Sequence, residues 1–231
     1  MIIRAVVFDL DQTLYDRDAT DTKAMRVYYS EHRDLFRPET TLEEATRAMI
    51  KGDHEGGHFG WPEILRVMNG ENVFAKIPDA KEICHDFQAL FALYGTLYPY
   101  TRTVLEQLMS MGLRTGLITN GNEIYQWGKI RGLGLGDCFD SILIGNNPET
   151  AKPHQEIFLE MAAKLRQVPT EMLYVGDHPV NDIDGSRKAG YTPIWVETMP
   201  WDFPEIAKPR HTIKNVSFLP QLVRELQGLG Q

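Results

Sequence analysis

The sequence predicts an α/β protein built on a doubly wound parallel sheet, with a helical insertion after the first strand. Short apolar runs alternate with helical segments from residue 96 to residue 231, as in chains of parallel strand–helix units. One more apolar run opens the chain, and residues 16–95 after it show almost no strand signal. We therefore expect a core made of residues 1–15 and 96–231 and an inserted helical domain made of residues 16–95.

The first strand is expected at Ala5–Phe8. These residues are apolar without interruption, which is typical of a strand buried on both faces of a parallel sheet. The segment from Asp9 to Thr13 is mostly polar and ends the strand. The carboxylates of Asp9 and Asp11 therefore stand at its carboxyl end.

The insertion is expected to hold several helices. Large side chains recur at helical spacing between residues 25 and 36, and Thr41 and Glu44 form a capping box that predicts a helix start. A segment rich in glycine and histidine, residues 52–60, is expected to be a loop. Further helices are expected over residues 61–68 and from Ile83 to a stop at Gly95.

The elements of the core after Gly95 follow from apolar runs and helix stop signals. Glycine follows several of the helical segments directly, which marks where they end. The expected strands are residues 113–119, 141–144, 172–175 and 192–196, and the expected helices are residues 103–111, 123–131, 155–165, 183–189 and 218–226.

The net charge of the chain limits the kinds of partner that we expect it to bind. The 24 Lys and Arg residues stand against 32 Asp and Glu residues, which gives a formal net charge of −8. A negative surface repels nucleic-acid backbones and anionic membranes, so we expect neither as a partner. A phosphorylated substrate would also be repelled at long range, and its site would need local positive charge.

The cysteines and the hydropathy pattern bear on the cellular setting. Cys84 and Cys138 are far apart and fit no zinc or redox spacing. The sequence holds no run of about 18 apolar residues, and charged residues interrupt its first apolar stretch, so we expect no membrane span and no signal peptide. A reducing, cytoplasmic setting is the default expectation, with monomer and homodimer both open.

Polar residues follow three of the predicted strands. Asp9 and Asp11 follow the first strand, Thr119-Asn-Gly121 ends another, and Gly176-Asp177 ends a third, with Asp182 five residues beyond Asp177. Ligands of open parallel sheets bind at the carboxyl ends of the strands, so the topology can bring these groups to one edge.

The four aspartates of this edge would need a cation. Two unit charges about 4 Å apart repel each other by roughly 4 kcal/mol at an intermediate dielectric constant. An all-oxygen ligand set suits a hard ion, and Mg²⁺ is the usual one beside phosphate. We therefore expect Mg²⁺ near Asp9, Asp11, Asp177 and Asp182.

A phosphoryl group would find donors at the same edge. Thr119 offers a hydroxyl, and the backbone N–H groups of Asn120 and Gly121 stand where the next helix begins. Lys152, just before another helix, is a nearby positive charge for the transition state. The Asp9 carboxylate could then form a covalent phosphoryl intermediate, and Asp11 could give a proton to the leaving oxygen and later take one from the attacking water.

These segments resemble the four motifs of the haloacid dehalogenase-like hydrolase superfamily. Residues 9–13, Asp-Leu-Asp-Gln-Thr, resemble its first motif, Asp-x-Asp-x-Thr. Residues 117–121 resemble the second, Lys152-Pro153 the third, and Gly176-Asp177 with Asp182 the fourth. The motifs stand in the order of the family and span nearly the whole chain, which makes the signal specific.

The resemblance implies a Rossmann-like core and makes the helical insertion a cap domain. It implies Asp9 as the nucleophile and Asp11 as the general acid and base, with catalytic Thr119 and Lys152. It also implies Mg²⁺ held by Asp9, the backbone carbonyl of Asp11 and Asp177, with Asp182 supporting the ion directly or through water.

The second aspartate decides between the activities of the family. Members that dehalogenate carbon lack it and phosphatases carry it, so Asp11 favours phosphate chemistry. The motifs are similar to those of the helical-cap phosphatase branch, such as N-acylneuraminate 9-phosphatases and pyrimidine 5′-nucleotidases. The expected function is therefore Mg²⁺-dependent hydrolysis of a small phosphate monoester, such as a sugar phosphate or a nucleotide.

Two kinds of alternative stay open. A phosphomutase or a dehalogenase would share the fold, and only the reaction products separate them from a phosphatase. A non-catalytic binding protein on the same scaffold would lack the nucleophile, the acid or the lysine, and the sequence lacks none of the three.

Overall fold

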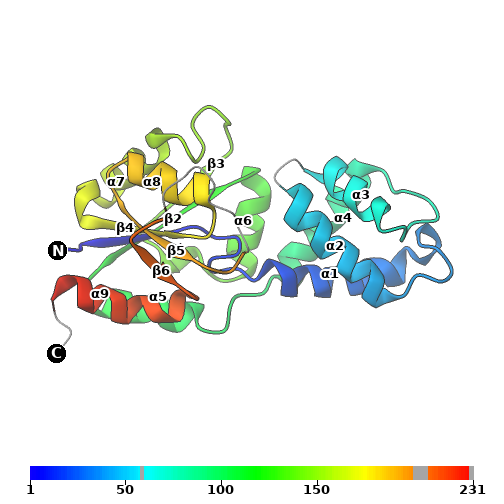
Figure 1. The fold of residues 1–231 in the computed structure, drawn as a ribbon, viewed down its shortest axis with the longest axis horizontal. Coiled ribbons are helices and arrows are strands. Elements are labelled where there is room, and N and C mark those ends of the chain that lie inside the picture. Colours follow the sequence, from blue (N-terminus) through cyan, green and yellow to red (C-terminus); the bar gives the residue numbers. More distant parts are fainter. Residues whose placement is uncertain (58–59, 200–207, 229–231) are drawn as a thin grey trace. The chain divides into compact units, whose positions relative to one another are not determined.

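The computed structural model describes residues 1–57, 60–199 and 208–228 and divides the chain into two compact units. One unit consists of Met1–Asp16 and Leu97–Gln231 and holds the sheet; the other consists of Arg17–Thr96 (Figure 1).

Within the described residues, the sheet of the first unit contains six parallel strands in the order β3-β2-β1-β4-β5-β6. This is the strand order of the Rossmann fold, so the predicted fold class is confirmed. The strands are β1 (Ala5–Phe8), β2 (Arg114–Asn120), β3 (Ser141–Gly145), β4 (Met172–Gly176), β5 (Thr192–Val196) and β6 (His211–Ile213). Five were predicted; β6 was missed because its three residues contain no apolar run.

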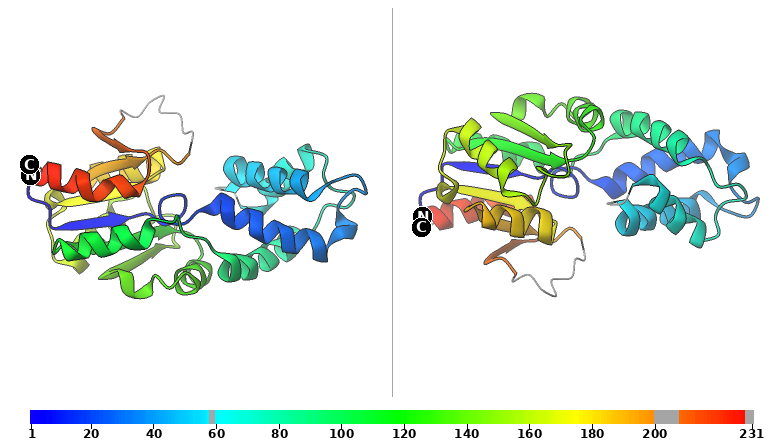
Figure 2. Two further views of the ribbon diagram at one scale, coloured as in Figure 1. Left: turned by 90° about the horizontal axis from the view of Figure 1, so that it is seen from below. Right: turned by 90° about the horizontal axis from the view of Figure 1, so that it is seen from above.

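Helices cover both faces of the sheet (Figures 1 and 2). Val6 and Phe8 of β1 pack in one hydrophobic cluster with side chains of α5, α6 and α9, whereas Ala5 and Val7 pack in another with side chains of α7. Burial of both faces explains why β1 is apolar throughout. The helices are α5 (Thr101–Ser110), α6 (Glu123–Gly132), α7 (Gln155–Leu165), α8 (Gly185–Lys188) and α9 (Leu219–Gln227).

The segment after β4 differs from the prediction. A helix was expected to begin at residue 183, but a π-helical turn already runs over Pro179–Asp184 and leads into α8. The side chain of His178 starts it by accepting hydrogen bonds from the backbone N–H groups of Val180 and Asn181, both at 3.1 Å. A histidine at this position is an uncommon helix start, so the sequence pattern did not reveal it.

The register of the strands aligns their carboxyl ends. Phe8 lies opposite Leu117 of β2 on one side and Val175 of β4 on the other. Asp9 is therefore flanked by the last residues of β2 and β4. The strand order also reverses at β1, which is where Rossmann-like sheets bind ligands.

The second unit is built of helices α1 (Arg17–Glu31), α2 (Leu42–Gly56), α3 (Trp61–Gly70) and α4 (Ala80–Tyr94), with a short 3₁₀ turn over Arg33–Leu35. They enclose a hydrophobic core of their own that includes Tyr28, Phe36 and Phe87. This list of elements fits the helical character expected for the insertion, and its role as a cap stays a prediction.

The start and the end of α2 test two local predictions. The capping box is confirmed: the Glu44 N–H donates to Thr41 Oγ1 at 3.2 Å, and the Thr41 N–H donates to Glu44 Oε2 at 2.8 Å. The loop prediction was wrong over residues 52–56, which continue the helix; residues 58 and 59 lie outside the described part of the chain. A Cβ on Gly56 would lie 2.9 Å from backbone atoms of Glu63 and Ile64, so this glycine permits close packing of α2 and α3.

No helix in the described ranges of residues is both long enough and apolar enough to cross a membrane.

Two ion pairs join the start of α1 to the end of α2. Arg17 pairs with the buried carboxylate of Asp53, and His54 Nε2 lies 2.8 Å from Asp18 Oδ1. The hydrogen bond to Asp18 raises the pKa of His54 above its ordinary value, against the opposing effect of partial burial.

The raised pKa of His54 predicts a pH-dependent contribution to stability. Since the folded-state pKa lies above the unfolded value of about 6.5, the stabilisation is full below that pH and is lost as the pH rises through the folded-state pKa. We expect His54→Asn to lower the urea midpoint of this unit at about pH 5 and to change it much less at about pH 9. His85→Asn, which changes an exposed histidine of α4, is the control. A His54→Asn effect that is constant over this pH range would contradict the prediction.

Candidate active site

A tight reversal of the chain follows β1 and places Asp9 at the sheet edge. The Asp9 N–H donates to the carbonyl of Val175 at 2.9 Å, which continues the ladder to β4. Gln12 then adopts a left-handed conformation with φ of 60°, and its N–H donates to the carbonyl of Tyr15 at 2.8 Å. A residue with a side chain is rare in this conformation. Tyr98 holds it in place by donating from its hydroxyl to Gln12 Oε1 at 2.9 Å.

The side chain of Lys152 lies at the centre of the site. Its ammonium group donates to Asp9 Oδ1 at 2.6 Å, to Asp182 Oδ1 at 2.7 Å and to the Tyr174 hydroxyl at 3.0 Å. These three acceptors match the three protons of an ammonium group. The side chain is only 3% exposed, so the structure brings the predicted Lys152, Asp9 and Asp182 into one buried network.

Asn120 positions Lys152 through the backbone. Its Nδ2 donates to the Lys152 carbonyl at 2.8 Å, and its Oδ1 accepts from the Lys152 N–H at 3.0 Å. The prediction that the Gly121 N–H faces an anion was wrong, because this N–H donates to the carbonyl of Gly145 at 3.1 Å. That hydrogen bond joins the end of β2 to the end of β3, and it uses the donor that the anion would need.

Three of the predicted metal-binding residues form one cluster. Asp9, Asp177 and Asp182 are buried, and each offers a carboxylate oxygen that lies within 4.8 Å of the other two. Asp182 is oriented by the His178 N–H, which donates to its second oxygen at 2.9 Å. Gly176 makes room for it, since a Cβ there would lie 2.5 Å from the Asp182 carboxyl group.

The electrostatics of this cluster follow from its burial. Burial raises the pKa of Asp9 to about 7; Lys152 opposes the shift, while the charges of Asp182 and Asp11 add to it. Burial alone would lower the pKa of Lys152, but the carboxylates of Asp182 and Asp9 outweigh burial and raise it well above its ordinary value. Lys152 pairs with two of the three clustered carboxylates, and the buried carboxylate oxygens of the cluster are ligands that a hard divalent cation prefers.

Asp11 and Thr119 lie in a second hydrogen-bond network, to which α6 contributes two side chains. Lys129 Nζ donates to both carboxylate oxygens of Asp11, at 2.7 and 2.9 Å. Gln126 Nε2 lies 3.2 Å from Asp11 Oδ2 and 3.1 Å from the buried hydroxyl of Thr119. The structure therefore brings Asp11 and Thr119 together through Gln126, apart from the three-carboxylate cluster.

Sequence reasoning missed three residues of these networks. Tyr174 is a polar-tipped aromatic residue in an otherwise apolar strand, and a buried tyrosine hydroxyl usually has a partner. Gln126 and Lys129 are spaced by three residues on the helix that follows Thr119, so they share one helix face. Both signals were present in the sequence, but neither belongs to one of the four motifs.

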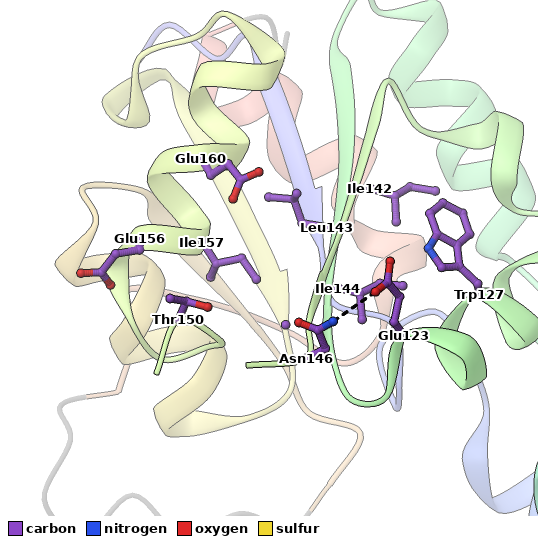
Figure 3. A pocket seen from close by; sticks show the side chains of 11 residues that line it. Glu123, Trp127, Ile142, Leu143, Ile144, Asn146, Thr150, Glu156, Ile157 and Glu160 are labelled. Carbon is purple, nitrogen blue, oxygen red and sulfur yellow. Dashed lines mark hydrogen bonds between the residues drawn. The ribbon is translucent and has the colours of Figure 1, made fainter. Parts of the chain in front are cut away.

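A cavity of about 430 Å³ lies elsewhere in this unit, along the edge strand β3 (Figure 3). Trp127 and Ile142 line one part of it and Ile157 another, and Asn146 donates to Glu123 at 3.1 Å within it. None of the predicted site residues lines this cavity, so it is not the candidate active site.

The match to a family model agrees with this geometry. The haloacid dehalogenase-like hydrolase family matches residues 3–190, which span the four motifs. The chain belongs to the haloacid dehalogenase-like hydrolases and is an enzyme of the hydrolase class, which confirms the resemblance derived from the motifs.

Three similar proteins illustrate the relationship. A glyceraldehyde 3-phosphate phosphatase of Methanopyrus kandleri is 30% identical over 199 residues, which cover 84% of this chain and 83% of the relative. The pyrimidine 5′-nucleotidase YjjG of Escherichia coli is 28% identical over 232 residues, 94% of this chain and 96% of the relative. The solved structure of the hydrolase YfnB from Bacillus subtilis, bound to magnesium, superposes with a TM-score of 0.77 at 20% identity, over 96% of this chain and 99% of that chain, which shows the same fold.

The close approach of Gly176 and Asp182 predicts that a side chain at residue 176 destabilises the protein. Gly176→Ala places a Cβ where the Asp182 carboxyl group lies, and Asp182 is itself held by Lys152 and His178. We expect a loss of about 1–3 kcal/mol in the free energy of unfolding, measured by urea denaturation. Gly136→Ala is the matched control, because its Cβ meets no atom within 4 Å. Equal stability of the two variants would show that the site tolerates a side chain at residue 176.

Proposed function

We propose that this enzyme is a Mg²⁺-dependent phosphatase that hydrolyses a small phosphate monoester through an aspartyl-phosphate on Asp9. The observation that carries the proposal is the buried pair of Asp9 and Lys152, 2.6 Å apart, with the separately held carboxylate of Asp11 on the same chain reversal. The similarity to a glyceraldehyde 3-phosphate phosphatase and to a pyrimidine 5′-nucleotidase supports phosphate esters as the substrate class.

The phosphoryl group is held by Thr119 and Lys152. Thr119 offers a buried hydroxyl at the end of β2, and Lys152 offers a buried positive charge beside the nucleophile. Both are fixed before the substrate arrives, since Gln126 contacts the threonine and the Asn120 side chain fixes the lysine backbone. Donors that need no reorganisation stabilise the charge of a transferring phosphoryl group.

The first half of the reaction transfers the phosphoryl group to the protein. An oxygen of the Asp9 carboxylate attacks phosphorus, and the bond from phosphorus to the ester oxygen breaks. The Asp11 carboxyl group gives its proton to that oxygen, so the leaving group departs as an alcohol.

The second half regenerates the enzyme. A water oxygen attacks the phosphorus of the aspartyl-phosphate, and the bond from phosphorus to the Asp9 oxygen breaks. The proton of the water passes to Asp11, which restores its acid form, and inorganic phosphate leaves.

Mg²⁺ fits the cluster of Asp9, Asp177 and Asp182 because of its surplus of buried carboxylate oxygens. Asp9, Asp177 and the backbone carbonyl of Asp11 would hold the ion, and Asp182 would support it directly or through water. When bound, the ion supplies positive charge beside the phosphoryl oxygens.

Asp11 separates this proposal from dehalogenation. Departure of an alcohol needs a proton, whereas departure of a halide ion does not, and we assign the donation of that proton to Asp11. We expect the substrate to be a phosphorylated metabolite of the cytoplasm, and the helical unit Arg17–Thr96 to act as a cap that selects it.

A substrate panel tests the proposed function. Phosphate release is measured from sugar phosphates, nucleotides and phosphorylated organic acids, with Mg²⁺ and with EDTA. We expect release from at least one class with Mg²⁺ only, and Asp9→Asn, which keeps the shape of the side chain, is expected to lower it by about 10⁴-fold or more.

Trapping the intermediate supplies the control. Borohydride added during turnover should modify residue 9 of the wild type and leave Asp9→Asn unmodified. Retained activity of Asp9→Asn would contradict the assignment of Asp9 as the nucleophile. Isomerised sugar phosphate as the product points to a mutase instead, and halide released from a haloacid added to the panel points to a dehalogenase.

A further inference from the structure

We propose that Lys129 and Gln126 are positioning residues that hold the Asp11 carboxylate for both of its proton transfers. The inference rests on the proposed function and deepens it, because it gives the acid–base residue a support that lies outside the four family motifs. Its basis is the geometry of α6, which follows the strand that carries Thr119.

Lys129 holds Asp11 at both oxygens. The distances from Lys129 Nζ to Asp11 Oδ1 and Oδ2 are 2.7 and 2.9 Å, and the two side chains are 13% and 19% exposed. A surface ion pair shifts between geometries at little cost, but a largely buried pair with both oxygens engaged restricts rotation of the carboxylate. The orientation of Asp11 is therefore set by Lys129.

Lys129 is in turn held in place by its surroundings. Its ammonium group lies 5.0 Å from the ring centre of Tyr15, which is buried and pairs with Asp11 across the chain reversal. The helix that carries it begins at Asn122, whose side chain accepts from the N–H groups of Ile124 and Tyr125. A fixed helix and an aromatic face together limit the positions that the ammonium group can occupy.

Gln126 connects Asp11 to the phosphate-binding end of β2. It is 5% exposed, and its Nε2 lies 3.2 Å from Asp11 Oδ2, 3.1 Å from Thr119 Oγ1 and 2.7 Å from the Asn120 carbonyl. Its Oε1 is buried and has no hydrogen-bond partner within the described part of the chain. An apolar side chain of similar size would avoid burying this oxygen. The glutamine is therefore explained by what its Nε2 contacts.

The two aspartates of the first motif have separate lysines. Lys152 forms ion pairs with Asp9 and Asp182, and Lys129 forms an ion pair with Asp11. Without Lys129, repulsion from the carboxylates at the same sheet edge would favour turning Asp11 away from them. Asp11 must present an oxygen first to the ester oxygen and later to the water, so a displaced carboxylate would impair both half-reactions.

The experiment compares Lys129→Met with the wild type on p-nitrophenyl phosphate and on glyceraldehyde 3-phosphate, with Mg²⁺. Nitrophenolate departs without a proton, so formation of the aspartyl-phosphate should survive, while its hydrolysis, which needs Asp11, should become slow. We expect a burst of one nitrophenolate per enzyme molecule followed by slow turnover. On the alkyl ester, both steps need Asp11, and we expect kcat to fall by about 10²-fold or more without a burst and with little change in KM.

Three further variants control the comparison. Lys129→Arg keeps the charge and two donors and should restore most of the activity. Lys164→Met removes a lysine that pairs with Glu160 on the surface of α7, 3.6 Å away, and should match the wild type. Gln126→Met should change the kinetics on each of the two substrates in the same direction as Lys129→Met does. It serves as the test variant if Lys129→Met does not fold.

The outcomes separate the inference from the function on which it rests. Equal losses on both substrates without a burst, or wild-type kcat in Lys129→Met, overturn the positioning role and leave the phosphatase intact. A wild type that releases phosphate from neither compound, nor from any other member of the substrate panel, overturns the proposed function and the inference with it.

Discussion

The site depends on the hydrogen bonds and ion pairs that the buried ammonium group of Lys152 makes. It joins Asp9, which follows β1, to Asp182, in the turn after β4, and to Tyr174 within β4. Removing one partner of such a network leaves an unpaired charge in a nearly dry environment, which typically costs about 3–5 kcal/mol. The carboxylates of Asp9 and Asp182 can lie this close together because the lysine offsets their repulsion.

Several other features of the core position the residues that surround Lys152. The strand order puts β1 between β2 and β4, and the alignment of their carboxyl ends brings in Asn120, which fixes the backbone of Lys152. Gly176 leaves the space that the Asp182 carboxyl group occupies. The left-handed conformation of Gln12 turns the chain back after Asp9 and brings Asp11 to the reach of α6. These features together bring residues of different elements to one edge of the sheet.

The site as a whole separates two tasks. Lys152 contacts Asp9, the proposed nucleophile, within the three-carboxylate cluster where we propose the metal, while Lys129 and Gln126 contact Asp11. Thr119 touches the second group through Gln126. This separation would suit the two-step reaction that we propose, because a nucleophile and an acid–base residue that act on opposite sides of one phosphorus need independent support.

The amino-acid sequence predicted the parallel sheet, five of the six strands that the described residues form, and the residues of the four motifs, because apolar runs and strand-end carboxylates are local signals. It was wrong about the end of α2, the helix start after β4 and the N–H of Gly121, because close helix packing, a histidine cap and a bond between strand ends involve distant or uncommon partners. Tertiary structure alone decided that Asn120 fixes Lys152, that Tyr174 completes the lysine network, and that Lys129 and Gln126 contact Asp11. Those contacts join residues of different elements. The separation of two such residues along the chain does not predict the distance between them in the folded protein.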